Sequence, residues 1–133
     1  MNKKDWILEQ TTPYQELIKL LLPEEIFEYF EIIKLDVTLD TIHVYLDERD
    51  IKPENFKTQK LTSKGFHTEV IIQDFPIRRK AAMLHVRRRR WLVEQTGDVV
   101  SREWDSVAEG TRYTKSFADF LKGVLGHVPN QCK

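Results

Sequence analysis

The chain has 133 residues, of which 41% are hydrophobic and 32% are charged. That length fits one domain and that hydrophobic share suffices for a packed core, which excludes disorder throughout. The single cysteine, Cys132, excludes an intrachain disulfide and a cysteine-based zinc site. No apolar run approaches transmembrane length and the N-terminus lacks a signal-peptide stretch, so we expect a cytoplasmic protein with no membrane partner.

Opposite charges separate along the chain, although the formal net charge is zero. Residues 1–56 hold 6 lysine and arginine residues against 13 aspartate and glutamate residues, a net charge of −7. Residues 57–133 hold 15 against 8, a net charge of +7. A basic part of this kind can approach a polyanion, and the asymmetry also permits a homo-oligomer. We therefore expect an acidic part, 1–56, and a basic part, 57–133, within one compact domain.

Two short helices are predicted near the N-terminus. Apolar residues recur at helical spacing between Thr11 and Ile33, and Pro23 is predicted to open the second helix. The apolar positions of that second helix are Ile26, Phe27, Phe30 and Ile33.

A β-hairpin and a loop are predicted to follow. Residues 37–39 and 42–46 are the two expected strands, because apolar and polar residues alternate with period two over 42–46. The polar stretch 47–57 contains Pro53 and lacks periodicity, so we expect a loop that joins the acidic part to the basic part.

The basic part is predicted to hold three strands, 66–75, 81–93 and 99–104, in an antiparallel meander. A C-terminal helix is predicted from Thr114 to Leu125, because Thr114 is a favourable N-cap and the following apolar residues keep a three-four spacing. The expected fold class is therefore α+β: an N-terminal helical pair and β-hairpin, an antiparallel β-meander and a C-terminal helix.

The strongest local signal is a run of four arginines, Arg87 to Arg90, followed by Trp91 and preceded by the basic group 78–80. Arginine binds phosphate and guanine bidentately, so such a strand suits nucleic acid. Strand alternation sends Arg87 and Arg89 to one face and Arg88 and Arg90 to the other. The alternative is a solvated sheet face in which the arginines pair with Asp74, Glu94 and Glu103.

No catalytic constellation emerges from the sequence. The four histidines show no metal-ligand spacing, the serines lack a nucleophile-elbow pattern, and the five glycines are too far apart for a phosphate loop. We therefore expect no cofactor, no metal and no enzymatic activity of the chain by itself.

The order of several motifs resembles a known family. The motifs are SKGFH (63–67), IQDFPI (72–77), LHVRRRRW (84–91), TG (96–97), VSREW (100–104) and GTRYT (110–114). This series resembles the N-terminal-region proteins of Bacteroidetes-type insertion-sequence transposases, which are similar to the transposase class with a zinc-ribbon head. The chain departs from that class after Trp91, where 92–97 contains no cysteine. The resemblance therefore implies a zinc-ribbon-like meander without metal.

The resemblance implies binding to the terminal inverted repeats at the element ends. DNA cleavage and strand transfer would belong to a catalytic transposase subunit or domain. The segments 76–80 and 87–91 match the family's pattern, and 112–115 matches the entry to its following helical region.

Two functional hypotheses follow. In the first, the chain binds double-stranded DNA through Arg78, Arg79, Lys80, Arg87, Arg88, Arg89, Arg90 and Trp91, with Lys64, Arg102, Arg112 and Lys115 at the margin. In the second, it is a regulatory subunit that docks on the catalytic subunit without binding DNA itself, through the apolar helix face of Phe117, Phe120, Leu121 and Val124.

Overall fold

A computed structural model describes residue 17, residues 20–103 and residues 112–129 of the chain. Its elements in chain order are α2 (Glu24–Tyr29), β1 (Phe30–Val37), β2 (Thr41–Glu48), the short 3-10 helix η1 (Glu54–Phe56), β3 (Leu61–Phe66), β4 (Val70–Ile77), β5 (Lys80–Arg87), β6 (Arg89–Val93), β7 (Val99–Val100) and α3 (Lys115–Leu125). The predicted first helix lies mostly outside the described residues, as does the end of the strand predicted over 99–104.

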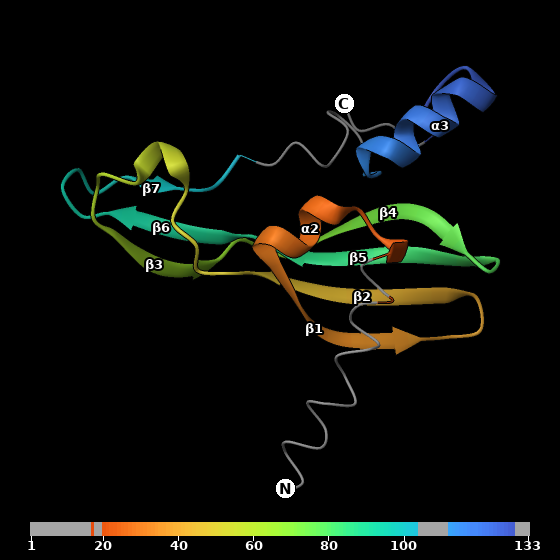
Figure 1. Ribbon diagram of the computed structural model, residues 1–133, viewed down its shortest axis with the longest axis horizontal. Helices are drawn as coiled ribbons and strands as arrows, with labels where there is room; N and C mark the ends of the chain where they lie inside the picture. Colours follow the sequence, from red (N-terminus) through yellow and green to blue (C-terminus); the bar gives the residue numbers. More distant parts are fainter. Residues whose placement is uncertain (1–16, 18–19, 104–111, 130–133) are drawn as a thin grey trace, which may run out of the picture.

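The strands form two sheets, and the chain runs from one sheet directly into the other (Figure 1). The first sheet has the order β1-β2-β5-β4 and the second has the order β3-β6-β7. β5 passes into β6 across Arg88, so the arginine run lies where one sheet gives way to the other. Among the named strands, each pairing is antiparallel except that of β2 with β5, which is parallel. The α+β class and the largely antiparallel sheet are confirmed.

The parallel pair joins the two oppositely charged parts of the chain. β2 comes from residues 1–56 and β5 from residues 57–133, and their register sets Asp47 opposite Arg87. The charge boundary at 56/57 is therefore not a boundary between sheets.

The β-hairpin near the N-terminus is confirmed, but its first strand is β1 and not 37–39, because residues 38–40 form the turn. The helix before the hairpin is also shorter than predicted. The prediction that the helix continues through Phe30 and Ile33 is wrong, because α2 ends at Tyr29 and Phe30 is already extended, with φ −126° and ψ 150°. The register shifts between Ile32 and Lys34, which leaves Ile33 as an extra residue in a β-bulge. The bulge interrupts the period-two pattern and leaves two adjacent isoleucines that look helical in the sequence.

Other element boundaries also differ from those predicted from the sequence. The loop predicted over 47–57 begins two residues later, because β2 continues through Glu48, and η1 forms inside it. The strand predicted over 66–75 corresponds to β4, which begins only at Val70, because residues 67–69 are an irregular connection; β3, which ends at Phe66, was not predicted. The strand predicted over 81–93 is β5 and β6.

The main core lies between α2 and one face of the first sheet. Its buried members come from α2, from the residues beside it and from all four strands of that sheet: Leu22, Ile26, Phe30, Val44, Leu46, Ile72, Leu84 and Val86. Burial of these apolar side chains is the main force that holds the four strands in register.

The C-terminal helix is attached to the outer edge of β4. α3 follows Thr114 and ends at Leu125, and the next residue, Gly126, has a φ of 83°, the left-handed conformation that favours glycine, so the predicted helix is confirmed. The Gln73 N–H donates to the Arg112 carbonyl, and the Thr114 N–H donates back to the Gln73 carbonyl. The Thr114 hydroxyl makes no cap bond; it donates to the buried Asp74 carboxylate at 2.7 Å.

We expect Thr114→Ala to lower the free energy of unfolding by about 1–3 kcal/mol, because it leaves a buried Asp74 oxygen without its donor. Thr114→Ser keeps the hydroxyl and should cost less than about 1 kcal/mol. Urea denaturation measures both values. Equal losses for the two variants would show that the hydroxyl contact to Asp74 does not stabilise the fold.

Candidate nucleic-acid interface

Arg87 is held by a carboxylate of the acidic part. Its Nε and Nη2 donate to the two oxygens of Asp47 at 2.7 Å and 2.5 Å, a bidentate ion pair. This hydrogen bonding raises the pKa of Arg87, against the opposing effect of desolvation. The guanidinium also lies 4.4 Å from the centre of the Phe66 ring. Arg87 therefore already has an anionic partner within the chain.

Glu48 is the buried acceptor at the centre of the junction between the sheets. The side chain of Glu48 is 1% exposed, and its two oxygens accept from the Arg89 backbone N–H at 2.9 Å and from Arg102 Nε at 3.2 Å. Arg89 also donates to the Glu48 carbonyl and to the Ser63 hydroxyl. The two arginines satisfy a carboxylate that would otherwise be buried at high cost.

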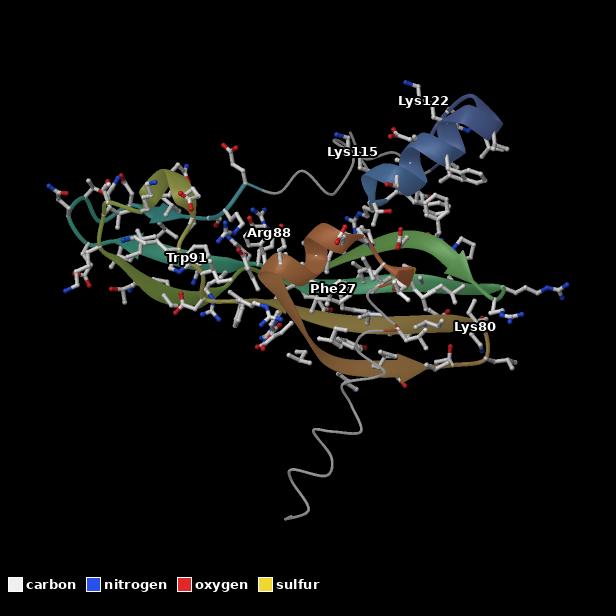
Figure 2. The ribbon with its side chains drawn as sticks, viewed as in Figure 1. Phe27, Lys80, Arg88, Trp91, Lys115 and Lys122 are labelled. Atoms are coloured by element: carbon white, nitrogen blue, oxygen red, sulfur yellow. The ribbon has the colours of Figure 1, made fainter. Side chains whose placement is uncertain are left out.

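The other two arginines of the run bond to backbone carbonyls. Arg88 donates to the carbonyl of Arg102, and Arg90 donates to the carbonyl of Lys64 at 3.1 Å. Figure 2 shows Arg88 where β5 passes into β6. Every arginine of the run thus has an acceptor within the chain, and Arg89 bonds to both sheets, to Glu48 of β2 and to Ser63 of β3.

The structure gives the arginine run different acidic partners from those considered in the sequence. Asp74 accepts from Thr114, and Glu94 accepts from Thr62 at 2.5 Å, a bond that lowers the pKa of Glu94. The parallel register of β2 and β5 instead supplies Asp47 and its neighbour Glu48.

Trp91 is a core residue. Its side chain is almost completely buried, and its indole N–H donates to Asp50 at 2.9 Å (Figure 2). A base-stacking or groove contact needs an exposed ring, so the structure does not favour Trp91 as part of an interface.

We expect Glu48→Gln to lower the free energy of unfolding by about 3 kcal/mol, because it leaves the largely buried Arg102 guanidinium facing a neutral amide. The control is Glu54→Gln, which breaks an exposed pair with Lys57 and should cost less than about 0.5 kcal/mol. Urea denaturation compares the two. Similar small losses would mean that the Glu48 charge does not hold the junction.

An arginine turn, defined as Arg78 and Arg79, forms the tip of the β4–β5 hairpin. Both residues have positive φ, 52° and 67°, and Ile77 pairs with Lys80 across the two-residue loop. This is the type I′ geometry, which strongly prefers asparagine and glycine. Both side chains are exposed, and neither has a hydrogen bond or ion pair with any residue that the structure describes.

Lys80, next to the arginine turn, is not free. Its ammonium donates to the carbonyls of Thr38 and Leu39, at 2.6 Å each, and so ties the β4–β5 tip to the β1–β2 tip. Figure 2 shows Lys80 at this end of the first sheet, far from Trp91. Its charge reinforces the arginine turn without being available for a bidentate contact.

The remaining predicted basic residues are distributed over two other places. Lys64 is exposed in β3 of the second sheet, beside Gly65. Arg112 and Lys115 are exposed next to the outer edge of β4, where Arg112 borders an open pocket of about 310 Å³. Arg102, predicted at the margin, is engaged with Glu48 and with the Tyr29 ring. Among the described residues, the predicted site therefore divides into cations that bond to an acceptor within the chain and exposed cations that do not.

A row of polar side chains lies on the face of the first sheet opposite the core, and the sequence analysis did not identify it. His43 Nδ1 lies 2.7 Å from His85 Nε2, and His85 Nδ1 lies 3.3 Å from a Glu69 oxygen. Tyr45 stacks on His85 with ring centres 4.2 Å apart. The parallel register of β2 and β5 brings His43 and Tyr45 beside His85, and the antiparallel pairing of β4 with β5 brings Glu69 there. Because one imidazole must donate to the other, the glutamate can fix the tautomer of His85.

Among the residues that the structure describes, no cluster of three or more His, Cys, Asp or Glu side chains is arranged to hold a metal. No helix within the same residues is long and apolar enough to cross a membrane. The chain matches no protein-family model, no curated protein and no solved structure.

Proposed function

We propose that the chain is a double-stranded DNA-binding module whose main contact is the arginine turn. The supporting observation is that Arg78 and Arg79 are exposed, bond to none of the described residues and adopt a strained conformation. A non-glycine residue in the left-handed region costs about 1–2 kcal/mol. Two such residues at one tip suggest that this tip is kept for a function other than stability.

The shape of the tip suits the proposed ligand. A two-stranded β-ribbon fits the major groove of B-DNA, and arginine there can bind phosphate or the guanine edge. The turn lies at one end of the first sheet, beyond the last β4–β5 partners, Ile77 and Lys80. The guanidinium groups can therefore reach a groove without any change in the core.

The arginine run has a supporting part in this proposal. Arg87 and Arg89 would have to give up Asp47 and Ser63 to contact phosphate, and the ion pair of Arg87 is part of the sheet junction. The exposed Arg112 and Lys115, next to the edge of β4, are better placed to add phosphate contacts beside the arginine turn, whereas Lys64 lies in the second sheet.

The resemblance extends the proposal to a biological setting. The chain would be the N-terminal region of an insertion-sequence transposase, would bind the terminal inverted repeats, and would not be catalytic by itself. A separate catalytic subunit or domain would cut and join the DNA.

We expect the double variant Arg78→Asn, Arg79→Gly to bind DNA more weakly and yet to be more stable. Asn-Gly is the preferred type I′ sequence, so the melting temperature should rise. Loss of two phosphate contacts should reduce the steepness of log Kd against log salt by about 1.8. Fluorescence anisotropy with an element-end duplex and a scrambled duplex, over a salt series, measures this change.

The matched control is Arg78→Lys, Arg79→Lys, which keeps both charges and should keep the salt slope. Unchanged affinity in the Asn-Gly variant would remove the arginine turn from the interface. Failure of the unaltered protein to bind either duplex at low salt would refute the DNA-binding proposal altogether.

The structure also supports the second candidate, a docking surface on α3. Phe117 is buried against the sheet edge, with its ring centre 4.9 Å from that of Phe75, whereas Phe120 and Val124 on the same helix are 51% and 65% exposed. Lys115 and Lys122 lie on the opposite side of the helix and point away from the sheet (Figure 2). This partly covered apolar stripe would bind the catalytic transposase subunit.

We expect Phe120→Ser together with Val124→Ser to abolish capture of the purified catalytic subunit without changing DNA affinity, because these exposed apolar side chains carry no charge that could contact phosphate. Lys122→Ala is the control and should keep the capture. Capture of the subunit by the double variant at the original level would exclude α3 as its docking surface.

A further inference from the structure

One edge of the first sheet has no partner among the described residues. β1 is the outer strand next to β2 (Figure 1), and its last apolar residues, Leu35 and Val37, are 42% and 57% exposed. The opposite edge, β4, is covered by the bridge between Gln73 and Tyr113. A long bare edge with apolar side chains is a template for another strand.

The outward backbone groups of β1 can be identified from its turn. The Thr38 N–H donates to the Thr41 carbonyl at 2.8 Å, so this is a hydrogen-bonded pair of the β1–β2 ladder. Such pairs alternate, which directs the backbone groups of Asp36 and Lys34 toward β2. The N–H and C=O groups of Leu35 and Val37 therefore point away from the sheet.

The side chains of β1 are complementary to those of a second β1 running the other way. Lys34 and Asp36 lie on one face of the strand, with Leu35 between them on the other. When a two-fold axis passes through Leu35, Lys34 lies opposite Asp36 of the partner subunit, and this pair occurs twice. An axis through Lys34 or through Asp36 would instead place like charges opposite each other.

We propose that β1 is the interface of a homodimer, in which two copies pair antiparallel around Leu35 and join their first sheets. The occupant is a second copy because the two charges lie at equal distances from Leu35 and have opposite signs. Each Leu35 then exchanges both backbone hydrogen bonds with the partner's Leu35, which satisfies the outward groups.

An apolar pocket beside β1 adds to this interface. It has a volume of about 130 Å³ and is lined only by apolar side chains, which include Leu21, Ile42 and Ile77 together with Leu35 and Val37 of β1. Leu35 and Val37 lie on the face of the sheet that carries Val44 of the core. In the dimer this face continues into that of the partner, so more of the pocket wall is removed from water.

Sedimentation equilibrium of the full chain over a range of concentrations tests the interface. The unaltered protein should show a reversible monomer–dimer equilibrium. Lys34→Asp and Asp36→Lys each create two like-charge pairs and should weaken the dimer by about tenfold or more. The double variant Lys34→Asp, Asp36→Lys restores opposite charges with reversed sign and should return the dissociation constant to near its original value.

Glu54→Lys, an exposed change in η1, is the control and should leave the dimer unchanged. A protein that stays monomeric at every concentration would overturn the proposal and indicate that something other than a second copy covers the edge. A dimer that tolerates the single reversals, or that the double exchange does not restore, would overturn it by placing the interface elsewhere.

Discussion

The fold depends on the acidic end of β2. Asp47 and Glu48 lie where the first sheet passes into the second, and they hold Arg87, Arg89 and Arg102 there. A buried carboxylate such as Glu48 stabilises a fold only when donors surround it. The arginines supply those donors, and the chain continues through them from β5 into β6. The junction is thus both the connection between the sheets and the place where the acidic and basic parts of the chain neutralise each other.

This neutralisation divides the basic residues into two groups with different uses. The cations next to Asp47 and Glu48 form a structural cluster, although they are the densest basic signal in the sequence. The arginine turn at the tip of β4 and β5 bonds to no residue that the structure describes, and its two side chains are exposed. The net charge of zero therefore hides a site, the arginine turn, that has no acidic partner among the described residues.

The two edges of the first sheet suggest separate uses for separate surfaces. The edge at β4 is closed by residues 112–114 and α3, whereas the edge at β1 is open among the described residues. Pairing through β1 would double the sheet and would leave the arginine turns of the two copies at opposite ends, free of the interface. The α3 stripe, at the far edge, would also stay accessible. DNA contact, subunit docking and self-association thus need not compete for the same residues.

The sequence by itself determined the local structure and the kinds of side chain available. The three-four spacing and Gly126 define α3, and period-two alternation defines the hairpin, because these signals act over a few residues. It could not show that Ile33 is a bulge residue, since that depends on the pairing of Ile32 and Lys34 with β2. Nor could it assign partners to the arginines. Arg87 and Asp47 are 40 residues apart in the sequence, and His43 and His85 are 42 apart. Only the parallel register of β2 and β5 brings the members of each pair together. That register is fixed by burial of apolar side chains from several strands at once, so only the tertiary structure decides which cations are engaged and which are free.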